Sequence, residues 1–254
     1  MSRTLLREWL AEEPFTLTLS SGFFGFFAHA GVVKALEEAD LLPRKLTGSS
    51  AGALIAGCWA GGMSAQDIKE LLFRLRRQDF WDPGFGQGLL KGDKFRQLLA
   101  DSLTVNNFSD CRAELCLSAY SMDSKQTIIL NEGDLVSAIY ASCAIPVMFQ
   151  PITINNHRLL DGGIKDRPAL DATEPGERIF YHHIASKSPW RRKNSSAIQV
   201  PKRDNLTSLV IHDLPRSGPF KLDIGQVAYQ KAYQAAQKAL HRTVVDGSVS
   251  VNSE

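Results

Sequence analysis

The feature that most constrains the fold is the regular alternation of strand-like and helix-like segments along the chain. Residues 15–19 alternate at period two, as a strand does, and residues 28–39 return to the helical spacing of about 3.6. A second strand pattern, 45–47, again leads into a helix, which ends near Ala60. Because strands that alternate with helices form parallel sheets, we expect an α/β fold with a mainly parallel central sheet.

The rest of the chain continues this pattern. Further helices are predicted at 3–11, 65–78 (capped by Ser64), 93–103, 134–143 and 227–244, and an ordered glycine-rich loop at 80–92. Further strands are predicted at 114–120, 126–130, 152–154, 158–160, 180–184 and 208–211. We expect one domain over 1–254, with its motif-bearing core at about 15–185 and residues 186–254 packing on that core.

Composition excludes several classes of protein. The formal net charge of +2 and the absence of clustered basic and aromatic residues argue against a nucleic-acid-binding protein. The four cysteines have no metal-ligand spacing, so we predict free, buried thiols and neither a metal nor another cofactor. The oligomeric state stays open.

The N-terminal segment and the apolar runs bear on location. Glu12 and Glu13 interrupt the region where a secretory signal would be apolar, and no apolar run approaches the ~20 residues that span a bilayer. We therefore expect a cytoplasmic protein, with peripheral contact to a membrane surface left open. The basic residues within 186–205 favour a solvated loop, with contact to anionic lipid headgroups as the alternative.

The pentapeptide Gly48-Ser-Ser-Ala-Gly52 has the pattern G-x-S-x-G between a strand and a helix. In such an elbow the serine lies on a tight, strained turn, and small residues on both sides let the flanking backbones pass closely. The turn would then project the Ser50 hydroxyl out of the sheet at a helix N-terminus, where unsatisfied N–H groups favour an anionic intermediate. The pentapeptide alone is a weak signal, because Ser50 could equally cap a helix.

Two further segments supply what a serine nucleophile needs. Residues 20–25 follow the first strand and are rich in glycine, so the amides of Gly22, Phe23, Phe24 and Gly25 are candidates for an oxyanion hole. Asp161 ends an apolar strand and precedes two glycines, which suits a partly shielded carboxylate acting as a base, although a turn-capping role is equally common.

Four blocks together resemble the patatin-like phospholipase family. They are the glycine-rich loop running into Ala28-His-Ala-Gly-Val32, the elbow Gly48–Gly52, Ala141-Ser-Cys-Ala-Ile-Pro146, and Asp161-Gly-Gly163. The resemblance covers about residues 15–170. It implies a three-layer α/β/α fold and hydrolysis of lipid acyl esters through an acyl-enzyme. It also implies a catalytic pair of Ser50 and Asp161 without a histidine, and the amides near Gly22–Gly25 as oxyanion hole.

Aromatic residues near these motifs are candidates for substrate contact. Phe23, Phe24, Phe26 and Phe27 would pack in the core, or would form an acyl-chain pocket or a membrane-touching rim. Of these, Phe23, Phe24 and Phe26 are the candidates for substrate binding. Trp81, Phe85 and Leu89 in the glycine-rich loop would form either a lid or an ordinary packed loop. His29, on the helix after the first loop, is expected to be structural.

Two rival functions remain at this stage. The first is a Ser–Asp–His hydrolase or acyltransferase, for which His182, His183, His212 or His241 would supply the imidazole. Against this rival, only one strand precedes the one that carries the elbow. The second is a lipid-binding module with a decayed site, suggested by a loop with fewer glycines than the family usually has.

Overall fold

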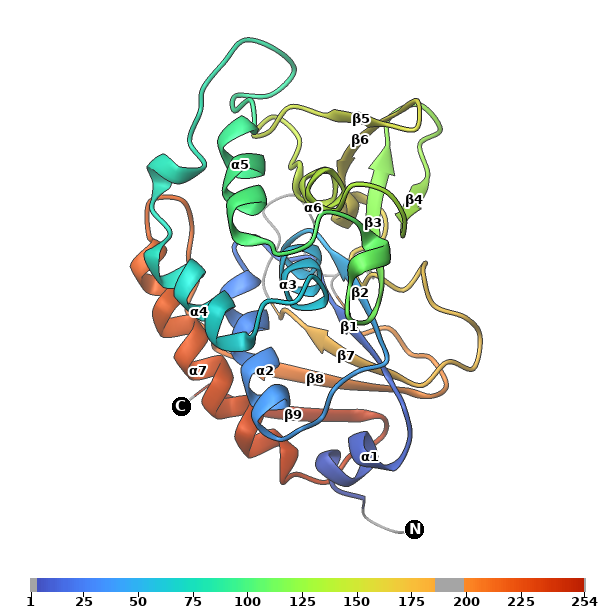
Figure 1. The fold of residues 1–254 in the computed structure, drawn as a ribbon. Coiled ribbons are helices and arrows are strands. Elements are labelled where there is room, and N and C mark those ends of the chain that lie inside the picture. The colour runs from blue at the N-terminus through green and yellow to red at the C-terminus, as the bar shows by residue number, and fades with distance from the viewer. Residues whose placement is uncertain (1–3, 186–198, 254) are drawn as a thin grey trace.

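The computed structural model describes residues 4–185 and 199–253, which form a three-layer α/β architecture around one central sheet (Figure 1). The sheet order is β5-β6-β3-β2-β1-β7-β8-β9, with β4 paired to β3. The strands are β1 (Thr16–Leu19), β2 (Lys45–Ser49), β3 (Glu114–Ser121), β4 (Thr127–Leu130), β5 (Ile152–Ile154), β6 (His157–Asp161), β7 (Ile179–His183), β8 (Leu206–His212) and β9 (Ser248–Asn252).

The sheet is parallel except at one edge. Strands β3, β2, β1, β7, β8 and β9 run parallel to one another, whereas β4 and β6 pair antiparallel to β3, and β5 pairs antiparallel to β6. Every residue of β1 and β2 is buried, as expected for central strands covered on both faces. Strands β5 and β6 form a hairpin through Asn155 and Asn156, and both residues have the positive φ that a tight turn requires.

Seven α-helices and three short 3-10 turns accompany the described strands. The helices are α1 (Leu6–Glu12), α2 (Phe26–Glu38), α3 (Ala51–Ala60), α4 (Ala65–Arg74), α5 (Asp93–Ser102), α6 (Leu135–Cys143) and α7 (Leu222–Leu240). The 3-10 turns are η1 (Arg77–Asp79), η2 (Phe108–Asp110) and η3 (Gly162–Ile164). Helices α3 and α6 pack on β2 and β3, and α2 packs along α7 (Figure 1).

The structure differs from the prediction most clearly at two helices and at one strand. The helix predicted over 65–78 ends at Arg74, because the backbone at Leu75 turns extended before η1. The C-terminal helix predicted over 227–244 runs from Leu222 to Leu240, and the chain then turns into β9. Strand β9 was not predicted, although its two buried valines alternate with polar residues at period two. Because β8 and β9 extend the sheet beside β7, this C-terminal part belongs to the same sheet.

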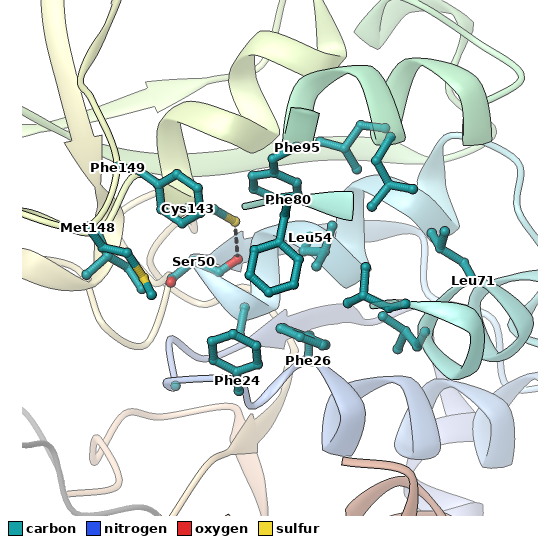
Figure 2. A pocket seen from close by; sticks show the side chains of 17 residues that line it. Phe24, Phe26, Ser50, Leu54, Leu71, Phe80, Phe95, Cys143, Met148 and Phe149 are labelled. Atoms are coloured by element: carbon teal, nitrogen blue, oxygen red, sulfur yellow. Dashed lines mark hydrogen bonds between the residues drawn. The ribbon is translucent and has the colours of Figure 1, made fainter. Parts of the chain in front are cut away.

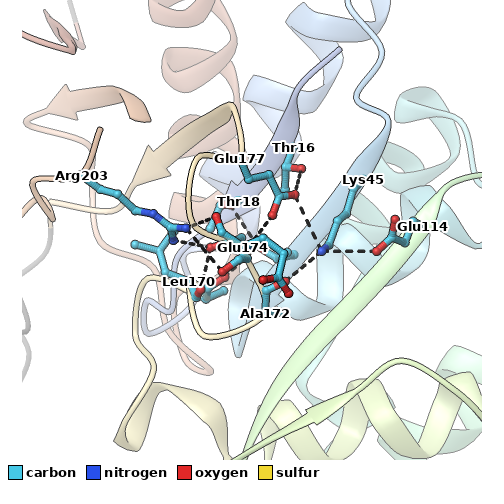
Figure 3. Close-up of polar contacts among 12 residues, drawn as sticks. Thr16, Thr18, Lys45, Glu114, Leu170, Ala172, Glu174, Glu177 and Arg203 are labelled. Carbon is cyan, nitrogen blue, oxygen red and sulfur yellow. Dashed lines mark hydrogen bonds and ion pairs between the residues drawn. The ribbon is translucent and has the colours of Figure 1, made fainter. Parts of the chain in front are cut away.

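A buried polar cluster ties the segment 162–178 to the amino ends of β1 and β2 (Figure 3). The side chain of Lys45 donates to the carbonyl of Ala172 at 2.9 Å and pairs with the buried carboxylate of Glu177 at 3.7 Å. Glu177 also accepts from the hydroxyl of Thr16. Because these groups satisfy one another, the segment that follows the last residue of β6 is held firmly against the sheet.

The close packing of α2 on α7 predicts a sensitive position. A Cβ at Gly31 would lie 2.5 Å from the backbone oxygen of Tyr229 and 2.8 Å from the amide nitrogen of Tyr233, neither of which can move without shifting α7. We expect Gly31→Ala to lower the free energy of unfolding by about 1–3 kcal/mol, because overpacking forces the helices apart. Urea unfolding followed by circular dichroism measures this change.

A matched control lies on the same helix. Lys34→Ala removes only a surface ion pair with Glu38 and should change stability by less than about 0.5–1 kcal/mol. Equal stability of Gly31→Ala and the unchanged chain would contradict the packing described for α2 and α7.

Candidate active site

Ser50 stands on a strained turn between β2 and α3. Its φ of 53° and ψ of −117° are unusual for a residue with a side chain, as the elbow pattern predicted. The flanking glycines have the expected steric role. A Cβ at Gly52 would lie 2.0 Å from the backbone oxygen of Leu19, and one at Gly48 would lie 2.6 Å from Cα of Ala53. Backbone packing alone therefore requires glycine at both positions.

The hydroxyl of Ser50 donates a hydrogen bond to Oδ2 of Asp161 at 2.5 Å. The sheet brings these residues together from opposite sides of β3. In the strand register, Ser49 lies beside Ser118, and Asp161 lies beside Ala119. The two side chains that sequence analysis paired across 111 positions are thus hydrogen-bonded in the structure.

Burial sets the electrostatics of Asp161. Desolvation raises the pKa of this carboxyl from 3.8 to about 6, and the hydrogen bonds from Ser50 and from the amide of Gly163 oppose the rise. The Gly163 amide reaches the second carboxylate oxygen at 2.8 Å, which fixes the orientation of the carboxylate. At neutral pH the group is therefore ionised and more basic than an ordinary aspartate.

A second set of hydrogen bonds holds the backbone of Ser50. Its amide donates to the hydroxyl of Ser142 at 2.9 Å, and this hydroxyl donates to the carbonyl of Ser118 at 2.6 Å. The hydroxyl of Ser118 in turn donates to Asp166 at 2.5 Å. All four side chains are buried. Ser142 belongs to the motif 141–146, but its contact with Ser50 was not predicted; a serine within an apolar helix is the available signal.

The loop before α2 offers backbone donors beside Ser50. The Gly25 amide is engaged within the turn, since it donates to the carbonyl of Gly22 at 2.8 Å. Among the described residues, the amides of Gly22, Phe23 and Phe24 have no hydrogen-bond acceptor. Phe24 has a positive φ of 54°, which marks a second strained residue at this site. Three of the four predicted oxyanion donors are thus unpaired, and Gly25 is not.

His29 holds this loop through a hydrogen bond to Ser20 and has no contact with Ser50. Its Nε2 hydrogen donates to the carbonyl of Ser20 at 2.7 Å, so its Nδ1 accepts from Nδ1 of His182 at 2.8 Å. Burial lowers the pKa of His29 to about 4 and that of His182 well below its usual value. Both rings are therefore neutral, and the expectation of a structural His29 agrees with these contacts.

None of the six histidines, all of which lie in the described ranges, hydrogen-bonds to Ser50 or Asp161. His182 pairs with His29, and His183 contacts the hydroxyl of Tyr181 at 2.9 Å. His212 contacts Ser250, and His241 follows the end of α7. The arrangement that a Ser–Asp–His site needs is absent from these contacts.

An apolar pocket extends from Ser50 toward α4 and α5 (Figure 2). Apart from Ser50 and Cys143, its lining side chains are apolar. They are Phe24, Phe26, Ala51, Leu54, Leu71, Leu72, Leu75, Phe80, Phe95, Leu98, Leu99, Ile145, Met148 and Phe149, with Gly22 at the Ser50 end. Figure 2 shows Ser50, Phe24 and Met148 toward one end and Leu71 at the other. This apolar lining suits a hydrocarbon chain.

The predicted aromatic cluster divides among three environments. Phe24 and Phe26, two of the three phenylalanines predicted to bind substrate, line the pocket. Phe23, the third, does not line it and is 47% exposed. Phe27 is fully buried in the core. The lining from α4, α5 and residues 145–149 was missed, because an apolar helix face looks the same whether it meets core or cavity.

Cys143 lies directly beside the nucleophile position. Its thiol donates to the carbonyl of Ser50 at 3.1 Å (Figure 2), and burial, reinforced by the charge of Asp161, raises its pKa well above 9.0. The thiol is therefore protonated at neutral pH. All four cysteines are free, as predicted, but Cys111 is only half-buried.

Other predictions concern the rest of the surface. Within residues 4–185 and 199–253, no group of His, Cys, Asp or Glu is arranged to hold a metal ion. No helix in these ranges combines the length and apolarity that crossing a membrane requires. Most of the basic stretch 186–205 lies outside the described residues.

Comparison with known sequences gives matches to one family. The model of the family "Patatin-like phospholipase" matches residues 17–173. An NTE family protein of Mycobacterium bovis is 28% identical over 162 residues, covering 59% of this chain and 42% of that protein. A triacylglycerol lipase of Schizosaccharomyces pombe is 28% identical over 165 residues, covering 54% of this chain and 34% of the lipase. The chain thus spans less than half the length of these relatives.

Among solved structures, VipD from Legionella pneumophila has the same fold. The TM-score is 0.64 at 15% identity, and the match covers 90% of this chain and 67% of VipD. The family match spans well over half of the chain and contains both the elbow serine and Asp161. The chain belongs to the patatin-like phospholipase family.

Proposed function

We propose that this protein hydrolyses the acyl esters of lipids, with Ser50 as nucleophile and Asp161 as its base. The observation that carries the proposal is the 2.5 Å hydrogen bond between these side chains at one end of an apolar pocket. The family supports lipid hydrolysis in general, and the name of the Schizosaccharomyces pombe relative, a triacylglycerol lipase, is consistent with an acyl ester as substrate.

The first half of the reaction forms an acyl-enzyme. The carboxylate of Asp161 takes the Ser50 proton as Oγ bonds to the ester carbonyl carbon, and the carbonyl oxygen becomes an oxyanion. The carbon–oxygen bond to the alcohol then breaks, and the departing oxygen takes the proton from Asp161. In the second half, water gives a proton to Asp161 and attacks the acyl carbon. The bond to Oγ breaks, and Ser50 recovers its proton as the fatty acid leaves.

Backbone amides stabilise the oxyanion in this scheme. The unpaired N–H groups of Gly22, Phe23 and Phe24 lie on the loop beside Ser50, and the first amides of α3 have no acceptor within the helix. Each such donor is worth roughly 2.7–4 kcal/mol of transition-state stabilisation. The low glycine content of the loop leaves these donors in place, so nothing in the geometry favours a decayed site.

The pocket supports an acyl chain as the group that is recognised. Helices α4 and α5 contribute only apolar side chains to its walls. In the whole lining, the polar side chains available to an ester are those of Ser50 and Cys143. A hydrocarbon chain lying there would place its ester carbonyl at the Ser50 end, between Phe24 and Met148.

Replacing the nucleophile tests the proposal directly. We expect Ser50→Ala to abolish hydrolysis of a short p-nitrophenyl ester and labelling by a fluorophosphonate probe. The neighbouring Ser49 offers a matched control, since its buried hydroxyl has no hydrogen-bond partner among the described residues. Ser49→Ala should retain both activities. Hydrolysis that persists in Ser50→Ala, or disappears equally in Ser49→Ala, would contradict the assignment.

The raised pKa of Asp161 predicts the pH dependence of catalysis. Only the ionised carboxylate can accept the Ser50 proton, so kcat/KM should rise with pH through about 6 and level off above it. Asp161→Asn should be inactive at every pH. A profile that is flat between pH 5 and 8 would argue against Asp161 as the base.

The same shift predicts a stability difference of definite sign. Because the folded state binds this proton more tightly than the unfolded chain does, ionisation of Asp161 lowers stability as pH rises from 3.8 through about 6. Asp161→Asn, which carries no charge, should therefore gain stability relative to the unchanged chain between these pH values, by about 2–3 kcal/mol. Thermal unfolding at pH 4 and pH 8 measures the difference.

Ser142 is predicted to act as a positioning residue. Ser142→Ala leaves the Ser50 amide and the Ser118 carbonyl without their partner, at about 1–3 kcal/mol for each buried group. We expect kcat to fall about tenfold or more, while KM for a short ester changes little, because the pocket is untouched. Ser137→Ala on the same helix, where the hydroxyl makes no hydrogen bond, is the control. A fall in KM and kcat together in both variants would indicate a merely structural effect.

A further inference from the structure

Several large apolar side chains of the described chain are exposed, and four of them lie around the Ser50 end of the pocket. We call Phe23, Phe85, Leu89 and Val147 the apolar rim. Phe23 precedes the pocket residue Phe24, and Val147 precedes the pocket residue Met148. The amide of Leu89 donates to the carbonyl of Val147 at 2.9 Å, which joins the two sides of the rim that come from distant parts of the sequence.

Val147 occupies an unusual conformation for its residue type. Its φ is 69°, in the left-handed region that β-branched residues rarely adopt, and its side chain is 75% exposed. Such a conformation costs on the order of a factor of ten or more in the folding equilibrium. Hydrogen bonds from Leu89 to the Val147 carbonyl and from Met148 to Ile145 hold this backbone, whereas the exposed side chain itself packs little within the described chain. Strain that brings an apolar side chain to the surface indicates a role outside the folded chain itself.

Two members of the rim, Phe85 and Leu89, lie on the glycine-rich loop 80–92. The Gln150 side chain donates to the carbonyl of Phe85 at 2.8 Å, and the Leu90 amide donates to the carbonyl of Met148 at 2.8 Å. These bonds fix the loop against the segment that lines the pocket. At its tip the side chain of Phe85 is fully exposed. The loop is therefore an ordered projection that holds an aromatic ring out in solvent.

The loop that carries Phe85 and Leu89 has no net charge. Between residues 80 and 92 its charged residues are Asp82 and Lys91, one of each sign. A surface with no net charge and protruding apolar side chains suits the apolar interior of a lipid layer more than an anionic partner. A protein partner that covered the rim would also lie across the end of the pocket where the ester has to enter.

We propose that the apolar rim is the face by which this protein docks on a lipid surface. Phe85 and Leu89 enter the acyl region, and the Ser50 end of the pocket faces the lipid, so that an acyl chain passes into the pocket without crossing water. The orientation rests on the lipid hydrolysis proposed above, whereas the docking itself does not require turnover.

Flotation with phosphatidylcholine vesicles tests the proposal on the full chain. The Ser50→Ala protein is used so that no lipid is consumed, and neutral lipid excludes attraction by the basic residues of the chain. Adding Phe85→Ser and Leu89→Ser should weaken vesicle binding about tenfold or more, because two apolar side chains no longer leave water. High salt should leave binding unchanged, since the rim has no net charge.

The control variant carries the same chemistry away from the pocket. Leu42→Ser with Val227→Ser removes two apolar side chains that are 58% and 49% exposed, and should bind vesicles as the Ser50→Ala protein does. Equal losses in both variants, or vesicle binding that survives Phe85→Ser with Leu89→Ser, would overturn the proposal. So would a change of oligomeric state in that variant without a loss of vesicle binding, which would assign the rim to a second protein copy.

A soluble short-chain ester separates the two proposals. In the chain with Ser50 present, Phe85→Ser with Leu89→Ser should hydrolyse this ester normally and lose activity only on vesicles. If the docking proposal fails, the soluble ester is still hydrolysed, and this hydrolysis is still lost in Ser50→Ala. Failure of the proposed function appears instead as hydrolysis that does not depend on Ser50.

Discussion

The hydrogen bond between Ser50 and Asp161 is the contact on which the rest of the site depends, and it exists because the sheet is not wholly parallel. Ser50 follows β2, which runs parallel to β3, whereas Asp161 ends β6, which runs antiparallel to β3. Reversal of this one edge returns the chain to the level of the elbow, so two residues far apart in sequence approach to 2.5 Å. Their meeting then requires only the strained turn at Ser50 and the Gly163 amide that orients the carboxylate.

Burial decides which group near this contact can carry the chemistry. Loss of water raises the pKa of Asp161 to about 6, where it is ionised at neutral pH and still basic. The same loss of water raises the pKa of the Cys143 thiol well above 9.0, so this neighbour stays protonated. It also keeps His29 and His182 neutral beside the loop 20–25. There they contact Ser20 and make no contact with Ser50 or Asp161. The same burial thus leaves Asp161 ionised at neutral pH, while the Cys143 thiol and both imidazole rings stay uncharged.

The parts of the site that sequence analysis predicted are those with a backbone requirement. Gly48 and Gly52 are fixed by close backbone contacts, and an aspartate before two glycines at a strand end has few equivalents in the chain. The hydroxyl of Ser142 and the helix faces that line the pocket carry no such mark, because their role depends on what lies across from them in space. The end of α4 was misplaced for a similar reason, since nothing in the local spacing distinguishes Arg74 from the residues after it.

The four phenylalanines at 23–27 show why spacing cannot settle a binding site. A uniform helix would turn their rings at even steps, but Phe24 takes a φ of 54° and breaks the progression just before α2 begins. Phe23 is thereby turned out to solvent, Phe24 and Phe26 into the pocket, and Phe27 into the core. Phe24, Ser50 and Val147 all have positive φ, and all three lie on or next to the same pocket. Such strain persists only where the surrounding structure over-determines it, and at Phe24 and Ser50 it sets the direction of side chains that line the pocket.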